Sequence, residues 1–100
     1  MICDVERKYY WNLSIMEEYF QHNGKIEGKY KKYHYNGQIH EEANIVNNKL
    51  NGIYKSYHEN GNLLVECIFI SDKKEGIYKY YNSNGQVLSE RNYINDHECI

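Results

Sequence analysis

Apolar and polar residues along this chain follow short runs with a period of two, the pattern of β-strands. No window sustains the 3.6-residue period of an amphipathic helix; residues 6–20 come nearest to it, but they match strand positions elsewhere in the chain. In the central run, one face of the predicted strands carries Tyr54, Leu63, Val65, Cys67 and Phe69, and the other carries Ile53, Lys55, Tyr57, Leu64, Glu66 and Ile68. Neither face is cleanly polar, so the pattern leaves open which face is buried.

The pattern recurs every 24 residues, with Gly28, Gly52 and Gly76 opening the segments GKYKKYHYNG, GIYKSYHENG and GIYKYYNSNG. A fixed period of this size indicates a repeat architecture in which each unit contacts only its neighbours. We expect one domain over residues 1–100, with units at 4–27, 28–51, 52–75 and 76–99. The first unit is degenerate, because Glu6 replaces a recurring tyrosine and Leu13 replaces the turn glycine. Terminal repeats are often atypical in this way.

Each unit predicts a β-hairpin. The dipeptides Asn36-Gly37, Asn60-Gly61 and Asn84-Gly85 favour a two-residue type I′ loop, in which both residues have positive φ. The polar segments between units, such as residues 47–52 and 71–76, predict looser return turns. Eight strands in this order form an all-β fold, a single-layer twisted antiparallel meander about 35–40 Å across at roughly 4.8 Å per strand.

Charged residues fix the expected register. If Asn36-Gly37 is a two-residue loop, residues whose numbers sum to 73 lie opposite one another, which pairs Lys31 with Glu42. The same rule gives three more pairs of opposite charge: Lys55 with Glu66, Lys79 with Glu90, and Arg7 with Glu18. Each such pair adds about 0.2–1 kcal/mol, and a one-residue slip would lose all of them.

Overall charge and cysteine content narrow the function classes. The 100 residues carry 12 Lys and Arg against 14 Asp and Glu, a net charge of −2, which argues against nucleic acid as the partner. No apolar run is long enough to span a bilayer, and no signal segment opens the chain. Three cysteines without CxxC spacing fit reduced thiols and a cytoplasmic location. The abundance of Asn, Lys, Ile and Tyr points to an AT-rich genome, that of a low-GC bacterium or of a large DNA virus active in a host cell or virion.

The sequence predicts no enzyme, cofactor or metal site. Each recurring glutamate faces a cation that keeps it ionised, and successive members of a column lie about 9–10 Å apart. His34 and His58 occupy equivalent positions beside the turns, too far apart to share an ion at bonds of about 2.1 Å, and we expect them to be solvated. No phosphate-binding, nucleophile-elbow or zinc-protease motif is present.

The recurring tyrosines form two columns that stack between units, hold a partner, or do both. As candidate partner-binding residues the sequence offers Tyr30, Tyr33, Tyr54, Tyr57, Tyr78 and Tyr81.

The pattern G-x-Y-x-x-Y-x-x-N-G, followed by a hydrophobic residue and a glutamate, resembles the MORN repeat, and more closely its short variant in bacteria and some large viruses. The resemblance covers residues 28–99 well and 4–27 weakly. It implies a twisted sheet of hairpins and a role in protein contacts, scaffolding, membrane-proximal recruitment or antitoxin-like inhibition. The chain lacks the H-G-x-G ending of the longer eukaryotic repeat, which argues against lipid binding.

The sequence therefore favours a non-enzymatic interaction module that binds a protein, or a second copy of itself, through a Tyr-rich face. The alternative is a membrane- or ligand-binding surface that combines tyrosines with Lys29, Lys31, Lys32 and Lys49. The last predicted strand, Val87–Ile94, is a second candidate, because an open sheet edge accepts a further strand.

Overall fold

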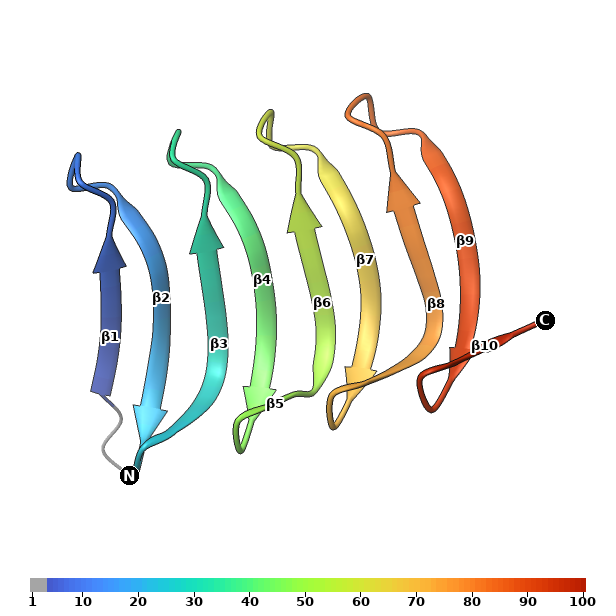
Figure 1. The fold of residues 1–100 in the computed structure, drawn as a ribbon, viewed down its shortest axis with the longest axis horizontal. Coiled ribbons are helices and arrows are strands. Elements are labelled where there is room, and N and C mark those ends of the chain that lie inside the picture. The colour runs from blue at the N-terminus through green and yellow to red at the C-terminus, as the bar shows by residue number, and fades with distance from the viewer. Residues whose placement is uncertain (1–3) are drawn as a thin grey trace.

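The computed structural model describes residues 4–100 as one antiparallel sheet of ten strands in a single layer (Figure 1). The strands are β1 (Asp4–Tyr9), β2 (Ile15–His22), β3 (Lys25–Tyr33), β4 (Ile39–Val46), β5 (Lys49–Leu50), β6 (Gly52–Tyr57), β7 (Leu63–Ile70), β8 (Lys73–Tyr81), β9 (Val87–Ile94) and β10 (His97–Cys99). They follow the order β1-β2-β3-β4-β6-β7-β8-β9-β10, and the two-residue β5 pairs with β4. The all-β meander is confirmed, and residues 6–20 form two strands rather than a helix.

Two of the ten strands were not predicted. The short strand β5 is the beginning of the β6 strand, separated from it by Asn51. The terminal strand β10 pairs with the end of β9, with His97 opposite Ile94 and Cys99 opposite Asn92. The prediction that Val87–Ile94 is an uncovered edge strand is therefore wrong for residues 92–94 and holds for 87–91.

The predicted register is confirmed in all four hairpins. Arg7 lies opposite Glu18, Lys31 opposite Glu42, Lys55 opposite Glu66 and Lys79 opposite Glu90. The strands between hairpins continue the row, because Glu18 also faces Lys31, Glu42 faces Lys55 and Glu66 faces Lys79. These eight residues, which we call the charge ladder, alternate in sign across the whole width of the sheet.

The turn types are the reverse of the prediction. In the loop of the third hairpin, the Gly61 N–H donates to the His58 carbonyl at 2.9 Å and the His58 N–H to the Asn62 carbonyl at 2.8 Å. Only the glycine has a positive φ, 92°. This is a three-residue loop, a type I turn followed by a left-handed residue. A one-residue bulge between Ser56 and Tyr57 then restores the register, which explains why a two-residue loop predicted the pairs correctly.

The return turns, predicted to be loose, are the two-residue type I′ loops. Ser71 and Asp72 have φ values of 49° and 70°, and their flanking residues Ile70 and Lys73 pair directly. The equivalent residue pairs at 23–24, 47–48 and 95–96 have the same positive φ values. Two successive residues in this region are what a type I′ turn requires, and its twist matches that of the flanking strands.

The degenerate first unit forms the same hairpin turn. The Leu13 N–H donates to the Tyr10 carbonyl at 2.9 Å, and Leu13 holds the position of the turn glycine with φ 73°. A leucine in this conformation brings its Cβ close to the following carbonyl oxygen, at a cost of about 1–2 kcal/mol. The other interactions of the hairpin offset this conformational free energy.

We predict that Leu13→Gly stabilises the protein by about 1 kcal/mol, because glycine adopts this conformation freely and the Leu13 side chain is 82% exposed. Denaturant titration followed by circular dichroism measures the change. The matched control is Leu88→Gly, at an exposed strand position of β9, where glycine should destabilise by about 0.5–1 kcal/mol. A loss of stability in both variants would contradict the left-handed conformation at Leu13.

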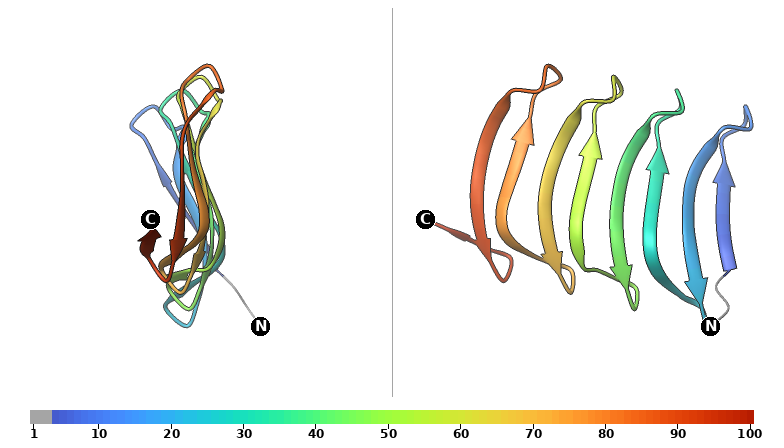
Figure 2. Two further views of the ribbon diagram at one scale, coloured as in Figure 1. Left: turned by 90° about the vertical axis from the view of Figure 1, so that its right-hand side faces the viewer. Right: turned by 180° about the vertical axis from the view of Figure 1, so that it is seen from behind.

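The small core lies on one face of the sheet, which we call the aromatic face. Its buried residues are Ala43, Ile45, Ser56, Val65 and Cys67. Rings pack beside them in pairs, with Tyr54 against Phe69 at 5.7 Å and Tyr78 against Tyr93 at 6.1 Å between ring centroids. The opposite face, which we call the ladder face, carries the charge ladder. Seen edge-on, the sheet is a thin twisted layer (Figure 2), and its extents are 42 × 31 × 16 Å.

Over residues 4–100, no helix is long and apolar enough to cross a membrane.

Candidate functional site

Hydrogen bonds connect neighbouring units at both ends of the strands. At the hairpin loops, the Nε2 atoms of His34 and His58 lie 2.8 and 2.9 Å from the carbonyl oxygens of Tyr57 and Tyr81 in the following units. Because a carbonyl oxygen only accepts, Nε2 carries the hydrogen in each ring. The expectation that these histidines are merely solvated is therefore wrong.

The turn asparagines make a second set of links. The Asn60 side-chain oxygen accepts from its own loop at the Asn62 N–H, while its amide donates to the Ser83 carbonyl of the next unit at 2.9 Å. Asn36 does the same with Gln38 and Glu59. The asparagines of the first two Asn-Gly pairs are thus explained by their two-sided hydrogen bonding and not by a left-handed backbone, whereas in the last hairpin the Asn82 side-chain oxygen accepts from the Asn84 and Gln86 N–H groups.

At the other end, each later return turn bonds back to the unit before it. The Asp72 N–H donates to the Leu50 carbonyl at 2.9 Å, and the Asp72 carboxylate accepts from the Leu50 N–H at 2.7 Å. Asn48 with Ile26 and Asp96 with Lys74 repeat this geometry. Both ends of the sheet are thereby occupied with structural contacts, which leaves the two faces as candidate binding surfaces.

The six candidate tyrosines divide between the two faces. Tyr54 lies opposite Cys67 on the aromatic face, whereas the Tyr57 hydroxyl donates to the Glu42 carboxylate of the charge ladder at 2.5 Å. Tyr30 and Tyr78 are equivalent to Tyr54, and Tyr33 and Tyr81 to Tyr57. All six are half-buried. One flat partner surface cannot cover both rows, and the role of these tyrosines as partner contacts stays a prediction.

Burial raises the pKa of four of the six tyrosines, Tyr30, Tyr54, Tyr57 and Tyr78. Burial, followed by the hydrogen bond to Glu42, raises the pKa of Tyr57 to about 12. Burial and the hydrogen bond that Tyr30 donates to Glu17 raise the pKa of Tyr30 as well. Burial also raises the pKa of the Cys67 thiol to about 11, so this cysteine is not an activated nucleophile. Cys3 lies outside the described residues.

The most exposed apolar surface of the central units is on the ladder face, and the tyrosine columns did not point to it. Ile53 lies directly opposite Ile68, Ile70 follows two residues along β7, and Ile77 lies on the same face of β8, where Glu75 and Lys73 are the residues opposite Ile68 and Ile70. Their exposed fractions are between 45% and 60%. We call these four residues the aliphatic strip. The signal for it was in the sequence, since Ile53 and Ile68 were assigned to the same face.

A hollow of about 440 Å³ lies at one end of the strip. Its lining residues include Lys29, Lys31, Lys55, Glu42, Ile53 and Gly52. Three ammonium groups against one carboxylate favour an acidic group in this hollow.

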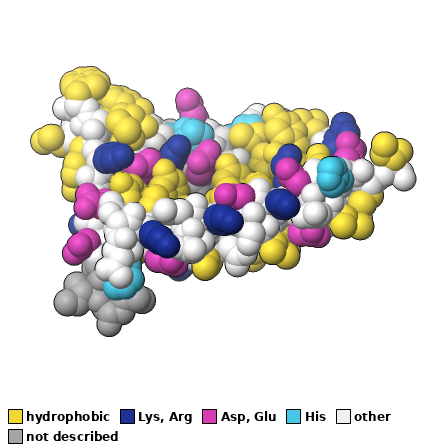
Figure 3. Space-filling view, turned by 60° about the horizontal axis from the view of Figure 1, so that its bottom comes forward, with side chains coloured by type: hydrophobic (Ala, Val, Ile, Leu, Met, Phe, Trp, Pro, Cys, Tyr) yellow, Lys and Arg dark blue, Asp and Glu magenta, His cyan; other side chains and the backbone are white. Residues whose placement is uncertain are grey.

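Two other surface features stand out in Figure 3. Hydrophobic side chains gather at the N-terminal end, where Trp11 is 86% exposed and lies 6.1 Å from the Tyr35 ring. Lys25, Lys49 and Lys73 hold equivalent exposed positions after the return turns, and Asp72 directly precedes Lys73.

Within residues 4–100, no group of three or more His, Cys, Asp or Glu side chains is arranged to hold a metal ion. The carboxylates of the charge ladder have cations beside them, as in the Arg7–Glu18 pair at 2.7 Å and the Lys55–Glu66 pair at 3.9 Å. No arrangement of nucleophile, base and orienting group is present among the described side chains.

The family model of the MORN repeat variant matches the chain three times, at residues 26–47, 50–70 and 74–95. The chain belongs to the MORN repeat variant family. Each match begins just after a return turn and covers one hairpin, β3–β4, β6–β7 or β8–β9. The β1–β2 hairpin lies outside these matches and has the same fold. Neither the curated proteins nor the solved structures gave a match.

MORN repeats are found in modules that contact proteins or membranes, and the family is generally non-catalytic. The predicted family and the predicted hairpin meander are both confirmed.

Proposed function

We propose that this MORN-repeat chain is a non-enzymatic binding module whose ladder face holds a protein partner. The observation that carries the proposal is the aliphatic strip, because several exposed aliphatic side chains on one face, with charged residues beside them, mark association sites on soluble domains. The hollow beside Ile53 adds a condition on the partner. The partner is expected to place apolar side chains against the aliphatic strip and an acidic side chain beside Lys29, Lys31 and Lys55.

The charge pattern supports a protein over a membrane. The four cations and four anions of the charge ladder cancel, so the face that bears the strip offers little net attraction to anionic lipid headgroups. The chain as a whole carries a net charge of −2. A protein interface tolerates such a neutral, alternating border, since its rim is polar and its central contacts are apolar.

The test compares affinity capture from the native source by the wild-type protein and by Ile68→Asp. The matched control is Tyr80→Asp on the aromatic face, since Tyr80 is 40% exposed and Ile68 45%. We expect Ile68→Asp to capture at least tenfold less of the partner than the wild-type protein does. Tyr80→Asp should capture the same amount as the wild-type protein. Tyr57→Ala combined with Tyr81→Ala tests the tyrosine column of the same face.

Two results would overturn the proposal. One is a partner retained equally by Ile68→Asp and the wild-type protein. The other is binding of the purified chain to vesicles of anionic lipid in co-sedimentation, with no protein captured by the ladder face.

A further inference from the structure

The two outer strands differ from the inner ones where they would touch if two copies met end to end. β1 is equivalent to β3, β6 and β8, and β9 is equivalent to β2, β4 and β7, by the 24-residue repeat. Every boundary between units joins a strand of the β9 kind to one of the β1 kind. β1 and β9 run in opposite directions at the two ends of the sheet (Figure 1). A second copy placed beside β9 therefore continues the meander.

The register of the inner boundaries fixes which residues would meet. Glu18 faces Lys31 across one boundary and Glu66 faces Lys79 across another. By the same spacing, Glu90 of one copy faces Arg7 of the next. The charge ladder would then continue without interruption, with opposite charges at the junction.

The position next to the charge ladder on each outer strand gives more specific evidence for contact between two copies. Inner boundaries place Tyr19 opposite Tyr30, and the equivalents of Tyr19 are Ala43 and Cys67. At the outer edges the same two positions hold Arg91 on β9 and Glu6 on β1. Residues that are aromatic or apolar inside the chain are thus replaced at its ends by a cation and an anion that would face each other.

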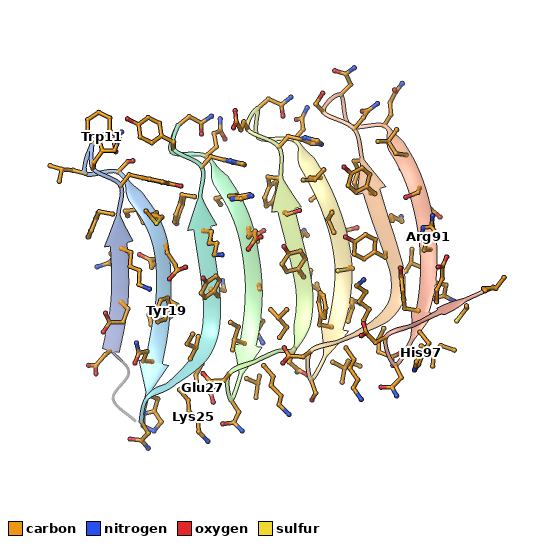
Figure 4. All side chains as sticks on the ribbon, in the orientation of Figure 1. Trp11, Tyr19, Lys25, Glu27, Arg91 and His97 are labelled. Atoms are coloured by element: carbon orange, nitrogen blue, oxygen red, sulfur yellow. The ribbon has the colours of Figure 1, made fainter. Side chains whose placement is uncertain are left out.

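Arg91 is accessible for this contact. Figure 4 shows it on β9, at the opposite end of the sheet from Tyr19. It is exposed and bonds Glu98 of β10 at 2.7 Å. A guanidinium has five N–H donors, so Arg91 can hold Glu98 and a second carboxylate together. Glu6 is exposed on β1.

The strand β10 leaves the required part of the edge free. It pairs with residues 92–94 of β9 and is equivalent to the first three residues of β3. β1 begins at Asp4, which is equivalent to position 100, so the terminal residue Ile100, directly after β10, has to move aside for Asp4 of the next copy. One copy therefore supplies the start of the next unit and the other copy supplies its continuation along residues 87–91.

We propose that the chain associates head to tail, with β1 of one copy pairing with β9 of the next. The contact is heterologous and does not close on itself in a dimer, so it extends into longer assemblies. Its small size makes it concentration-dependent. The proposal goes beyond the partner surface on the ladder face and does not depend on it.

Sedimentation velocity over a range of concentrations tests this proposal against the one-chain mass of 12.1 kDa. We expect the weight-average mass of the wild-type protein to rise past that of a dimer. Glu6→Arg and Arg91→Glu should each weaken association about tenfold, because like charges then face each other across the junction. Because Arg91→Glu also loses the bond to Glu98, Glu98→Lys is added to the double reversal, and this triple variant should associate like the wild-type protein.

Two controls keep the result specific. Glu59→Arg makes the same charge change in an exposed hairpin loop and should leave association unchanged. Thermal melts at low concentration should show every variant folded, and Ile68→Asp, which tests the partner surface, should still associate. A wild-type protein that stays at 12.1 kDa at about 1 mM, a triple variant that associates no better than the single variants, or an equal effect of Glu59→Arg would each overturn the head-to-tail contact.

Discussion

Replacing Val65 by aspartate is expected to unfold the sheet, whereas the same change at Ile68 on the same strand is expected to leave it folded. Val65 is 6% exposed on the aromatic face and Ile68 is 45% exposed on the ladder face. An ionised carboxylate removed from water without a partner costs several kcal/mol. That cost is a large part of the stability of a domain of this size, typically about 5 kcal/mol. At Ile68 the carboxylate stays hydrated, and the expected loss is about 1 kcal/mol.

Circular dichroism and thermal melts measure the difference directly. Folded Ile68→Asp with unfolded Val65→Asp identifies the aromatic face as the core. The reverse result, or equal melting temperatures, would mean that the core lies on the ladder face or that another molecule covers both faces. Because Ile68→Asp is also the variant that tests partner binding, its folded state is the control on which that test depends.

Replacing Gly85 by valine is expected to destabilise the protein by about 1–3 kcal/mol, the cost of a strained backbone conformation. Gly85 has φ 90°, and a Cβ built there meets no atom within 4 Å. The expected loss therefore comes from the backbone alone, since a β-branched residue rarely adopts positive φ. For a domain of this length each kcal/mol corresponds to a fall of about 4–8 °C in Tm.

The control at the same position is Gly85→Asn, because asparagine tolerates the left-handed region. Its expected loss is below 1 kcal/mol. At the preceding hairpin, Gly61→Val should cost more than Asn62→Val, since Gly61 has φ 92° and Asn62 does not require a positive φ. Equal melting temperatures for Gly85→Val and Gly85→Asn would contradict the three-residue loop with its left-handed glycine.

The sequence by itself determined the repeat, the eight strands of the four hairpins and the register. These follow from short-range features: the period of two, the 24-residue spacing, and charges such as Lys55 and Glu66 that favour only one pairing. The predicted pairs are correct although the predicted loop type is wrong, because the bulge beside Tyr57 compensates for the extra loop residue. The family could also be identified, since its motif consists of residues that are close in sequence within one hairpin.

The loop types, the role of His58 and the exposed surface were decided only by the tertiary structure. Asn60 is placed by bonds to its own loop and to Ser83, 23 residues away, a contact that no local propensity contains. His58 likewise donates to a carbonyl of the next unit, a contact between residues far apart in the sequence. The burial of Val65 and the exposure of Ile68 depend on the twist of the whole layer and on which rings pack beside it. Both faces carry apolar residues in the sequence, so only the three-dimensional arrangement decides which face is covered.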